Sequence, residues 1–149
     1  MSNKVKIRLA GRADTDVVSP LFNDYRKGFN EPDEVERCNE FIAERFLSDD
    51  SLILLAEEKK PVGFLLLYIG FSSVNLESYF TVNDLFVVKE QQGNGIGKAL
   101  LEHAITLARD NAAFEVRIST QKFNETAQGL YEKAGFKVEE ELLYYRLKF

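Results

Sequence analysis

The stretch Gln92-Gly93-Asn94-Gly95-Ile96-Gly97-Lys98 lies between a run of β-type residues and a long amphipathic helical pattern. Glycines at such a turn let the backbone reverse sharply and approach a ligand closely. The helix that follows presents its first free N–H groups, and the positive end of its dipole, to the same place. The turn therefore predicts an anion site, and a diphosphate is the usual ligand of such a site.

Two common phosphate-binding motifs do not match this turn. A Walker P-loop ends in Gly-Lys-Ser/Thr, but here Gly97-Lys98 is followed by Ala99, and Gln92 stands in place of the first glycine. A dinucleotide fingerprint begun at Gly93 would need its third glycine where this chain has Lys98. We therefore keep a nucleotide-binding domain only as a remote alternative.

The segments on either side of the turn predict a mixed α/β fold. Periodicity and turn residues predict strands over residues 4–9, 51–57, 62–72, 79–88 and 114–120, helices over 15–27, 34–46, 95–111 and 124–134, and a final hairpin over 137–141 and 143–149. Asp14 or Thr15 is expected to cap the first helix and Asp33 the second. The order β-α-α-β-β-β-α-β-α-β-β implies a central, mostly antiparallel sheet with one parallel crossover and helices on both faces.

Composition is typical of one globular domain, which we expect to span residues 1–149. The chain has 45% hydrophobic and 29% charged residues, and its net charge of −5 fits a cationic small substrate better than nucleic acid. Cys38 is the only cysteine and His103 the only histidine, so no metal site is expected and a Ser/His/Asp hydrolase is disfavoured. Neither a signal peptide nor a membrane span is predicted, and we expect a cytoplasmic protein.

A second informative pattern lies in residues 124–136. Asn124 is a good helix N-cap, and Tyr131 follows two helical turns later on the same face. A ligand along that face would meet the asparagine amide at one end and the phenol at the other. Gly135 is expected to end the helix. The alternative for Tyr131 is a packed core aromatic.

Together the two patterns resemble those of the GNAT superfamily of N-acetyltransferases. Gln92, Gly95 and Gly97 match the family signature Gln/Arg-x-x-Gly-x-Gly/Ala. The later segment matches as Asn124-x-x-Ala127-x-x-Leu130-Tyr131-x-x-x-Gly135-Phe136, and Asp84-Leu85-Phe86-Val87-Val88 is similar to the family's fourth strand. The resemblance covers nearly the whole chain and implies the family's fold, in which the parallel strand pair splays apart.

The resemblance also implies the co-substrate and its contacts. Acetyl-CoA would donate its acetyl group to a primary amine of a small molecule, which attacks the thioester directly in a ternary complex. The diphosphate would lie on backbone N–H groups of Gln92, Gly93, Asn94, Gly95, Ile96, Gly97 and Lys98, and the pantetheine arm beside Phe86, Val87 and Val88. Asn124 and Tyr131 would contact the arm, and a backbone N–H near Val88 would hold the thioester oxygen.

Acetyl transfer to an amine makes two proton demands. An alkyl ammonium has a pKa of about 10 and must lose a proton before it attacks, whereas the departing thiolate gains one. Tyr131 is the predicted acid. The diamine (polyamine) branch of the family commonly carries glutamate where this chain has Asn83, which cannot act as a base. Asp84 is the neighbouring candidate, although residues adjacent on a strand face opposite sides of the sheet. Deprotonation through water is the alternative.

Substrate and assembly are less constrained by the sequence. Glu31, Asp33 and Glu34 lie where the family places substrate-contacting loops and are candidates for attracting a cation, the alternative being a solvated helix start. A homodimer through the terminal hairpin is compatible with the sequence, which does not require it. Two other functions stay open: a weakly catalytic acyl-CoA-binding regulatory module, and acetylation of a protein amine.

Overall fold

The computed structural model describes residues 5–149, which divide into two compact units, one ending at Ser119 and one beginning at Thr120. The first unit contains β1 (Lys6–Leu9), α1 (Thr15–Lys27), α2 (Val35–Ser48), β2 (Ser51–Glu57), β3 (Pro61–Ser72), β4 (Glu77–Val87), α3 (Ile96–Asp110) and β5 (Val116–Ile118), with one-turn 3-10 helices at Arg12–Asp14 and Lys89–Gln91. The second unit contains α4 (Glu125–Lys133). Within residues 5–149, no helix combines the length and apolarity that a bilayer span requires.

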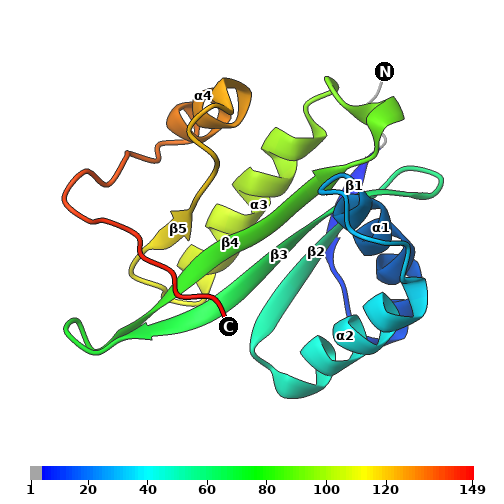
Figure 1. The fold of residues 1–149 in the computed structure, drawn as a ribbon, viewed down its shortest axis with the longest axis horizontal. Helices are drawn as coiled ribbons and strands as arrows, with labels where there is room; N and C mark the ends of the chain where they lie inside the picture. Colours follow the sequence, from blue (N-terminus) through cyan, green and yellow to red (C-terminus); the bar gives the residue numbers. More distant parts are fainter. Residues whose placement is uncertain (1–4) are drawn as a thin grey trace. The chain divides into compact units, whose positions relative to one another are not determined.

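The five strands form one mixed sheet in the order β1-β2-β3-β4-β5, as Figure 1 shows. Neighbours are antiparallel from β1 to β4, and β5 runs parallel to β4, which confirms the predicted crossover. The β5 pairing ends where Val82 lies opposite Ile118. Beyond that point β4 has an open edge on the β5 side.

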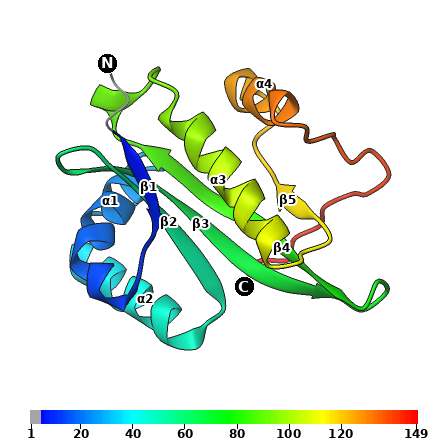
Figure 2. The same cartoon turned by 180° about the vertical axis from the view of Figure 1, so that it is seen from behind.

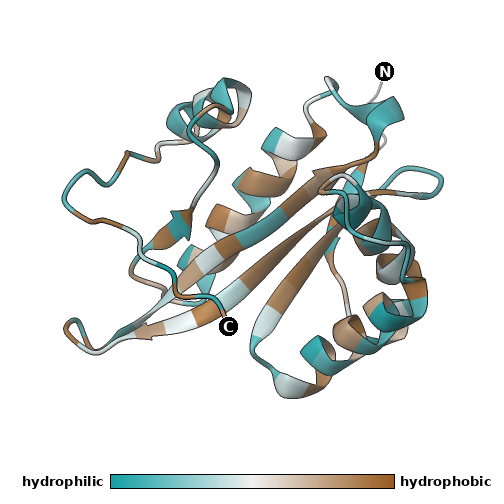
Figure 3. Ribbon diagram, viewed as in Figure 1, coloured by the Kyte–Doolittle hydropathy of each residue, from teal (hydrophilic) through white to brown (hydrophobic). Residues whose placement is uncertain are grey.

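Helices cover both faces of the sheet. In Figures 1 and 2, α1 and α2 lie on one face and α3 on the other. Phe64 and Leu66 of β3 pack with buried residues of α1 and α2, whereas Leu65 and Leu67 alternate with them and point to the α3 face. Hydrophobic residues accordingly run along the central strands in Figure 3, and hydrophilic ones follow the outer helix surfaces.

The C-terminal end of the chain differs from the predicted elements. The prediction of a terminal hairpin is wrong, because residues 137–149 form no strand in the structure. Their apolar side chains are exposed, with Leu143 at 79% and Tyr144 at 87%. Alternation of apolar residues favours a strand only where a hydrogen-bonding partner is available. The predicted start of the first strand, Lys4, lies outside the described residues.

The start of α2 is organised by a side chain from α1. Asn23 is buried, donates from Nδ2 to Asp33 Oδ1 at 2.8 Å, and accepts the Glu34 N–H at 2.9 Å. The sequence predicts that Asp33 caps α2, but in the structure its carboxylate accepts from Asn23 and does not cap the helix. Asp14 does precede α1, but its carboxylate accepts from Arg8 and from the Gly11 N–H instead of capping the helix. Asp33 thus helps to hold the start of α2, and Asp14 links β1 to the start of α1.

Candidate active site

The glycine turn that follows β4 has an open, left-handed backbone. Gly93 and Gly95 have φ values of 85° and 81°, a region that other residues rarely adopt. No atom lies within 4 Å of where a Cβ would stand on either glycine. The turn therefore leaves space at the N-terminus of α3 that a side chain would fill.

Backbone donors converge on this space. The first helical hydrogen bond of α3 runs from Ala99 N to Gly95 O at 3.0 Å, so the N–H groups of Ile96, Gly97 and Lys98 precede it at the helix N-terminus. The first turn of α3 contains no acidic residue. This end of the helix is therefore suited to an anion such as a diphosphate.

The side chain of Gln92 ties the turn to the end of β4. Its Nε2 donates to Val87 O at 2.9 Å, which shows that this carbonyl points away from β3. Val88 N donates instead to Val62 O at 2.9 Å. Because strand residues alternate in direction, Leu85 and Val87 present their backbone groups to the open edge. An oxyanion donor near Val88 can therefore be Val87 N–H, but not that of Val88 itself.

A β-bulge at Asn83 decides where Asp84 points. Leu66 pairs with Asp84 and Leu67 with Val82, so Asn83 is an extra residue on β4. Paired residues share a face, which places Asp84 with Leu66 on the α1–α2 face. The expectation that Asp84 lies opposite Asn83 is wrong, since Asn83 Nδ2 donates to Asp84 Oδ2 at 3.0 Å.

Asp84 lies in a half-buried setting that favours its neutral form. Burial raises the pKa of Asp84 above its ordinary value, while hydrogen bonds from the Asn83 amide and the Tyr25 hydroxyl act in the opposite direction. A carboxyl group whose pKa is raised is better matched to take a proton from an amine. The site therefore contains a candidate base.

Three side chains near Asp84 are not singled out by the sequence. Tyr25 hydrogen bonds to Asp84, Tyr68 is close enough to sense its charge, and Arg45 hydrogen bonds to Tyr68. Burial and the charge of Asp84 raise the pKa of Tyr68, and Arg45, which hydrogen bonds to Tyr68, lowers it. The two tyrosines follow apolar patterns of a helix and a strand, which predict core packing. Only the tertiary fold brings their hydroxyl groups to the polar end of this face.

The segment that contains Asn124 and Tyr131 forms α4 as predicted. Asn124 Oδ1 accepts the Ala127 N–H at 3.1 Å, which confirms the N-cap. At the other end, Gly135 has a φ of 103°, and the Phe136 N–H donates to Tyr131 O at 3.0 Å, the pattern of a Schellman motif. The rings of Phe136 and Tyr131 lie 6.1 Å apart, so the motif also orients the tyrosine.

Tyr131 is suited to donating a proton. Its side chain is half-buried, and burial raises the pKa of Tyr131 above its ordinary value of about 10. The hydroxyl is therefore protonated at neutral pH, as a general acid requires.

The three predicted substrate-binding acids belong to ion pairs and hydrogen bonds of the α1–α2 connection. Glu34 accepts from Arg37 at 3.1 Å and from Arg26 at 3.0 Å, and these bonds lower its pKa. Glu31 lies 3.4 Å from Arg26, and Asp33 accepts from Asn23. Their attraction for a cation is therefore partly compensated, and a substrate role stays a prediction.

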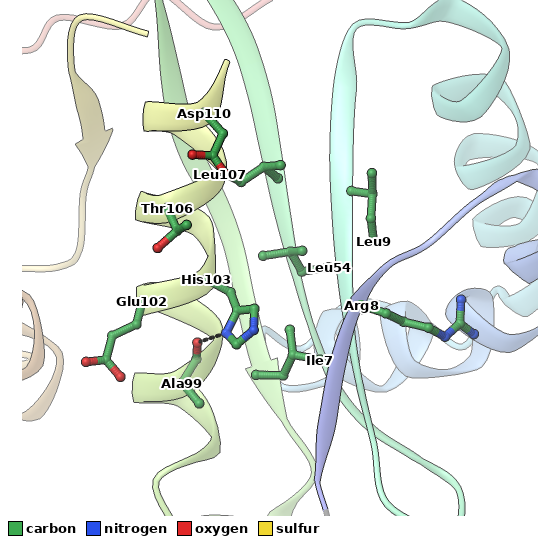
Figure 4. A pocket seen from close by; sticks show the side chains of 10 residues that line it. All are labelled: Ile7, Arg8, Leu9, Leu54, Ala99, Glu102, His103, Thr106, Leu107 and Asp110. Atoms are coloured by element: carbon green, nitrogen blue, oxygen red, sulfur yellow. Dashed lines mark hydrogen bonds between the residues drawn. The ribbon is translucent and has the colours of Figure 1, made fainter. Parts of the chain in front are cut away.

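A separate hollow of about 450 Å³ lies between β1 and α3 (Figure 4). Its lining includes Ile7 and Leu54 on the sheet and His103 on the helix, where Nδ1 is 3.0 Å from Ala99 O. The glycine turn, residues 83–87 of β4, Tyr25 and Tyr68 do not line it. We therefore assign this hollow no part in the chemistry.

Comparison with known proteins finds acetyltransferases among the relatives of this chain. The N-acetyltransferase YhfO of Bacillus subtilis is 34% identical over 144 residues, which cover 96% of this chain and 97% of its own. The peptidyl-lysine N-acetyltransferase YjaB of Escherichia coli is 33% identical over 100 residues, 66% of this chain and 58% of its own. The crystal structure of a probable acetyltransferase superposes with a TM-score of 0.90 at 33% identity, with 97% of each chain covered.

The model of the acetyltransferase (GNAT) family matches residues 18–136. The match runs from α1 to the end of α4 and includes the glycine turn, the bulged strand and the Asn124–Tyr131 helix. This chain therefore belongs to the GNAT family of acetyltransferases.

Proposed function

We propose that this protein transfers the acetyl group of acetyl-CoA to a primary amine of a small molecule, with Asp84 as general base and Tyr131 as general acid. The position of Asp84 carries the proposal. The bulge at Asn83 turns the Asp84 carboxylate to the α1–α2 face, where burial raises the pKa of Asp84. An acid in this setting meets the first proton demand of the reaction.

The described residues fit acetyl-CoA. The N–H groups of residues 96–98 can donate hydrogen bonds to a diphosphate, and the open left-handed turn leaves room for it. The open edge of β4 offers backbone groups of Leu85 and Val87 to an extended arm, as a neighbouring strand would use them. We assign Val87 N–H to the thioester oxygen and the Asn124 amide to the arm.

The residues then act in sequence on two protons. Asp84 accepts a proton from the substrate ammonium, and the neutral amine forms the new C–N bond as the thioester C–S bond breaks. Tyr131 donates its proton to the departing sulfur and takes back the second proton that the nitrogen loses as the amide forms, and Asp84 then releases its proton to solvent. Asn83 supports the base through its hydrogen bond to Asp84 Oδ2 and does not itself accept the proton.

Acetylation of a protein lysine is the second candidate. The relation to the peptidyl-lysine N-acetyltransferase YjaB favours it. A panel of small amines beside lysine-containing peptides distinguishes the two, because a protein-directed enzyme will release thiol with the peptides and only slowly with the small amines.

The first experiment is thermal unfolding with and without acetyl-CoA, with ATP and NAD as controls. A ligand at 100 times its Kd stabilises a protein by about 2.7 kcal/mol, which is several degrees for a domain of this size. We expect a shift with acetyl-CoA alone, followed by thiol release with amines. The absence of a shift at millimolar acetyl-CoA would remove the glycine turn as an acyl-CoA site. A shift without thiol release for any amine would instead indicate a binding module.

A further inference from the structure

We infer that Tyr25 is a positioning residue for acetyl transfer, because its hydroxyl donates to Asp84 and holds that carboxylate oriented and ionised as the base. The inference rests on the proposed function, since Tyr25 acts only through Asp84.

The ring of Tyr25 is held on the strand pair that carries Asp84. Its centroid lies 5.6 Å from that of Phe64 on β3 and 5.8 Å from that of Phe86 on β4. Phe64 and Phe86 pair directly, and two residues along the same ladder Leu66 pairs with Asp84. The ring also meets the Phe29 ring edge-on, with their centroids 5.1 Å apart. These contacts leave the ring little freedom, so the position of its hydroxyl is set by the fold.

Packing alone does not require a hydroxyl at this position. The ring packs against aromatic neighbours and the hydrophobic core of this face, contacts that a phenylalanine would satisfy equally well. A tyrosine hydroxyl placed on such a face needs a hydrogen-bond partner. Asp84 provides one.

Asp84 receives two neutral donors, the Tyr25 hydroxyl and the Asn83 amide. Hydrogen bonds to a carboxylate favour its ionised form, whereas burial favours the neutral form. The two donors therefore oppose the effect of burial and favour the ionised form that a base requires.

The charged groups around this face are engaged with one another. Arg45 of α2 lies 3.4 Å from Asp50 and also hydrogen bonds to Tyr68 of β3. Arg117 of β5 pairs with Glu115 and stacks on the Tyr79 ring, 3.6 Å from its centroid. Both arginines thus have an acidic partner, and Asp84 receives its hydrogen bonds from Tyr25 and Asn83.

The test compares Tyr25→Phe with wild type and with Tyr68→Phe as a matched control. Both substitutions remove one phenol hydroxyl from the same face, but only Tyr25 donates to Asp84. We expect Tyr25→Phe to lower kcat/KM for thiol release by about tenfold on the acidic side of the pH profile, the equivalent of one lost stabilising bond to a charge. At high pH the loss shrinks to within about twofold. Tyr68→Phe keeps the acidic limb of wild type.

A second readout follows the carboxyl group directly. In protein carrying ¹³C-labelled aspartate, with the Asp84 signal assigned through Asp84→Asn, Tyr25→Phe moves the Asp84 titration to higher pH. An unchanged titration overturns the inference whatever the activity does. A uniform loss at all pH values, with no displaced limb, overturns it too and leaves Tyr25 as a packing residue.

The two readouts also separate this inference from the proposed function. If the carboxyl titration moves and the activity profile does not, Asp84 is not the base. The assignment of Tyr25 to catalysis then falls with that role, while thiol release still tests acetyl transfer itself.

Discussion

Asp84 combines a cost in stability with a use in catalysis. Its pKa is raised in the folded state, so its ionised form destabilises the fold at neutral pH, and this penalty disappears as the pH falls below that pKa. We therefore expect Asp84→Asn to raise the Tm at pH 8 and to lower kcat/KM by about 10²-fold or more. Differential scanning calorimetry at pH 8 and pH 4, beside thiol-release assays, checks both. A lowered Tm at pH 8 would contradict the burial argument.

Tyr131 is the second residue on which the chemistry depends. Tyr131→Phe keeps the ring against Phe136 and removes only the proton donor. We expect kcat to fall by about 10²-fold with little change in Tm. Full kcat with a good amine would mean that Tyr131 is not the acid. Phe136→Leu serves as a control for the packing of the ring.

At the scale of elements, the glycine turn works through its backbone. A β-branched residue at Gly95 would have to adopt a φ of 81° and would fill the space in front of the helix N-terminus. We expect Gly95→Val to cost about 1–2 kcal/mol, which lowers the Tm by about 2–8 °C, and to abolish the thermal shift with acetyl-CoA. Gly11→Ala is the control, because Gly11 has a φ of −123° and open space around its Cβ position. A normal acetyl-CoA shift in Gly95→Val would show that the turn is not part of the site.

The junction of α1 and α2 is a structural element without proposed chemistry. Asn23→Ala leaves the Glu34 N–H and Asp33 without their buried partner. We expect a loss of about 1–3 kcal/mol in the free energy of unfolding, measured in urea, and an unchanged KM for acetyl-CoA at 25 °C. A large rise in that KM would place the junction nearer to the chemistry than we propose.

The acids of the same connection belong to the question of the substrate. If Glu31, Asp33 and Glu34 attract a cationic amine, replacing all three by their amides should raise KM for that amine. The structure pairs them with Arg26, Arg37 and Asn23, so the expected rise is modest. An unchanged KM would remove them from the site.

At the scale of the whole molecule, we propose acetyl-CoA contacts for the glycine turn and for α4, and each contact is tested separately. The glycine turn belongs to the unit that ends at Ser119, and Asn124 and Tyr131 belong to the unit that begins at Thr120. We expect acetyl-CoA to slow amide hydrogen exchange both in residues 92–99 and in α4. Slower exchange in the turn alone would exclude Asn124 and Tyr131 as acetyl-CoA contacts.

Much of this architecture was predictable from local sequence alone. The boundaries of β2, the crossover from β4 through α3 to β5, the cap at Asn124 and the helix end at Gly135 all agree with the structure. Each depends on periodicity or backbone preference over a few neighbouring residues, which a sequence states directly. The terminal hairpin failed because a strand also needs a partner, which its own residues do not specify.

The direction of the candidate base, by contrast, was settled only by the tertiary structure. Asn83 becomes an extra residue because packing against α1 and α2 on one face and α3 on the other fixes which residues of β3 and β4 lie opposite one another. That register brings Asp84 to Tyr25 and commits the Val88 N–H to Val62. The chemical types needed for acetyl transfer are therefore written in the sequence. The direction in which these side chains point comes from long-range strand pairing, because a shift of one residue in a strand turns each side chain to the other face.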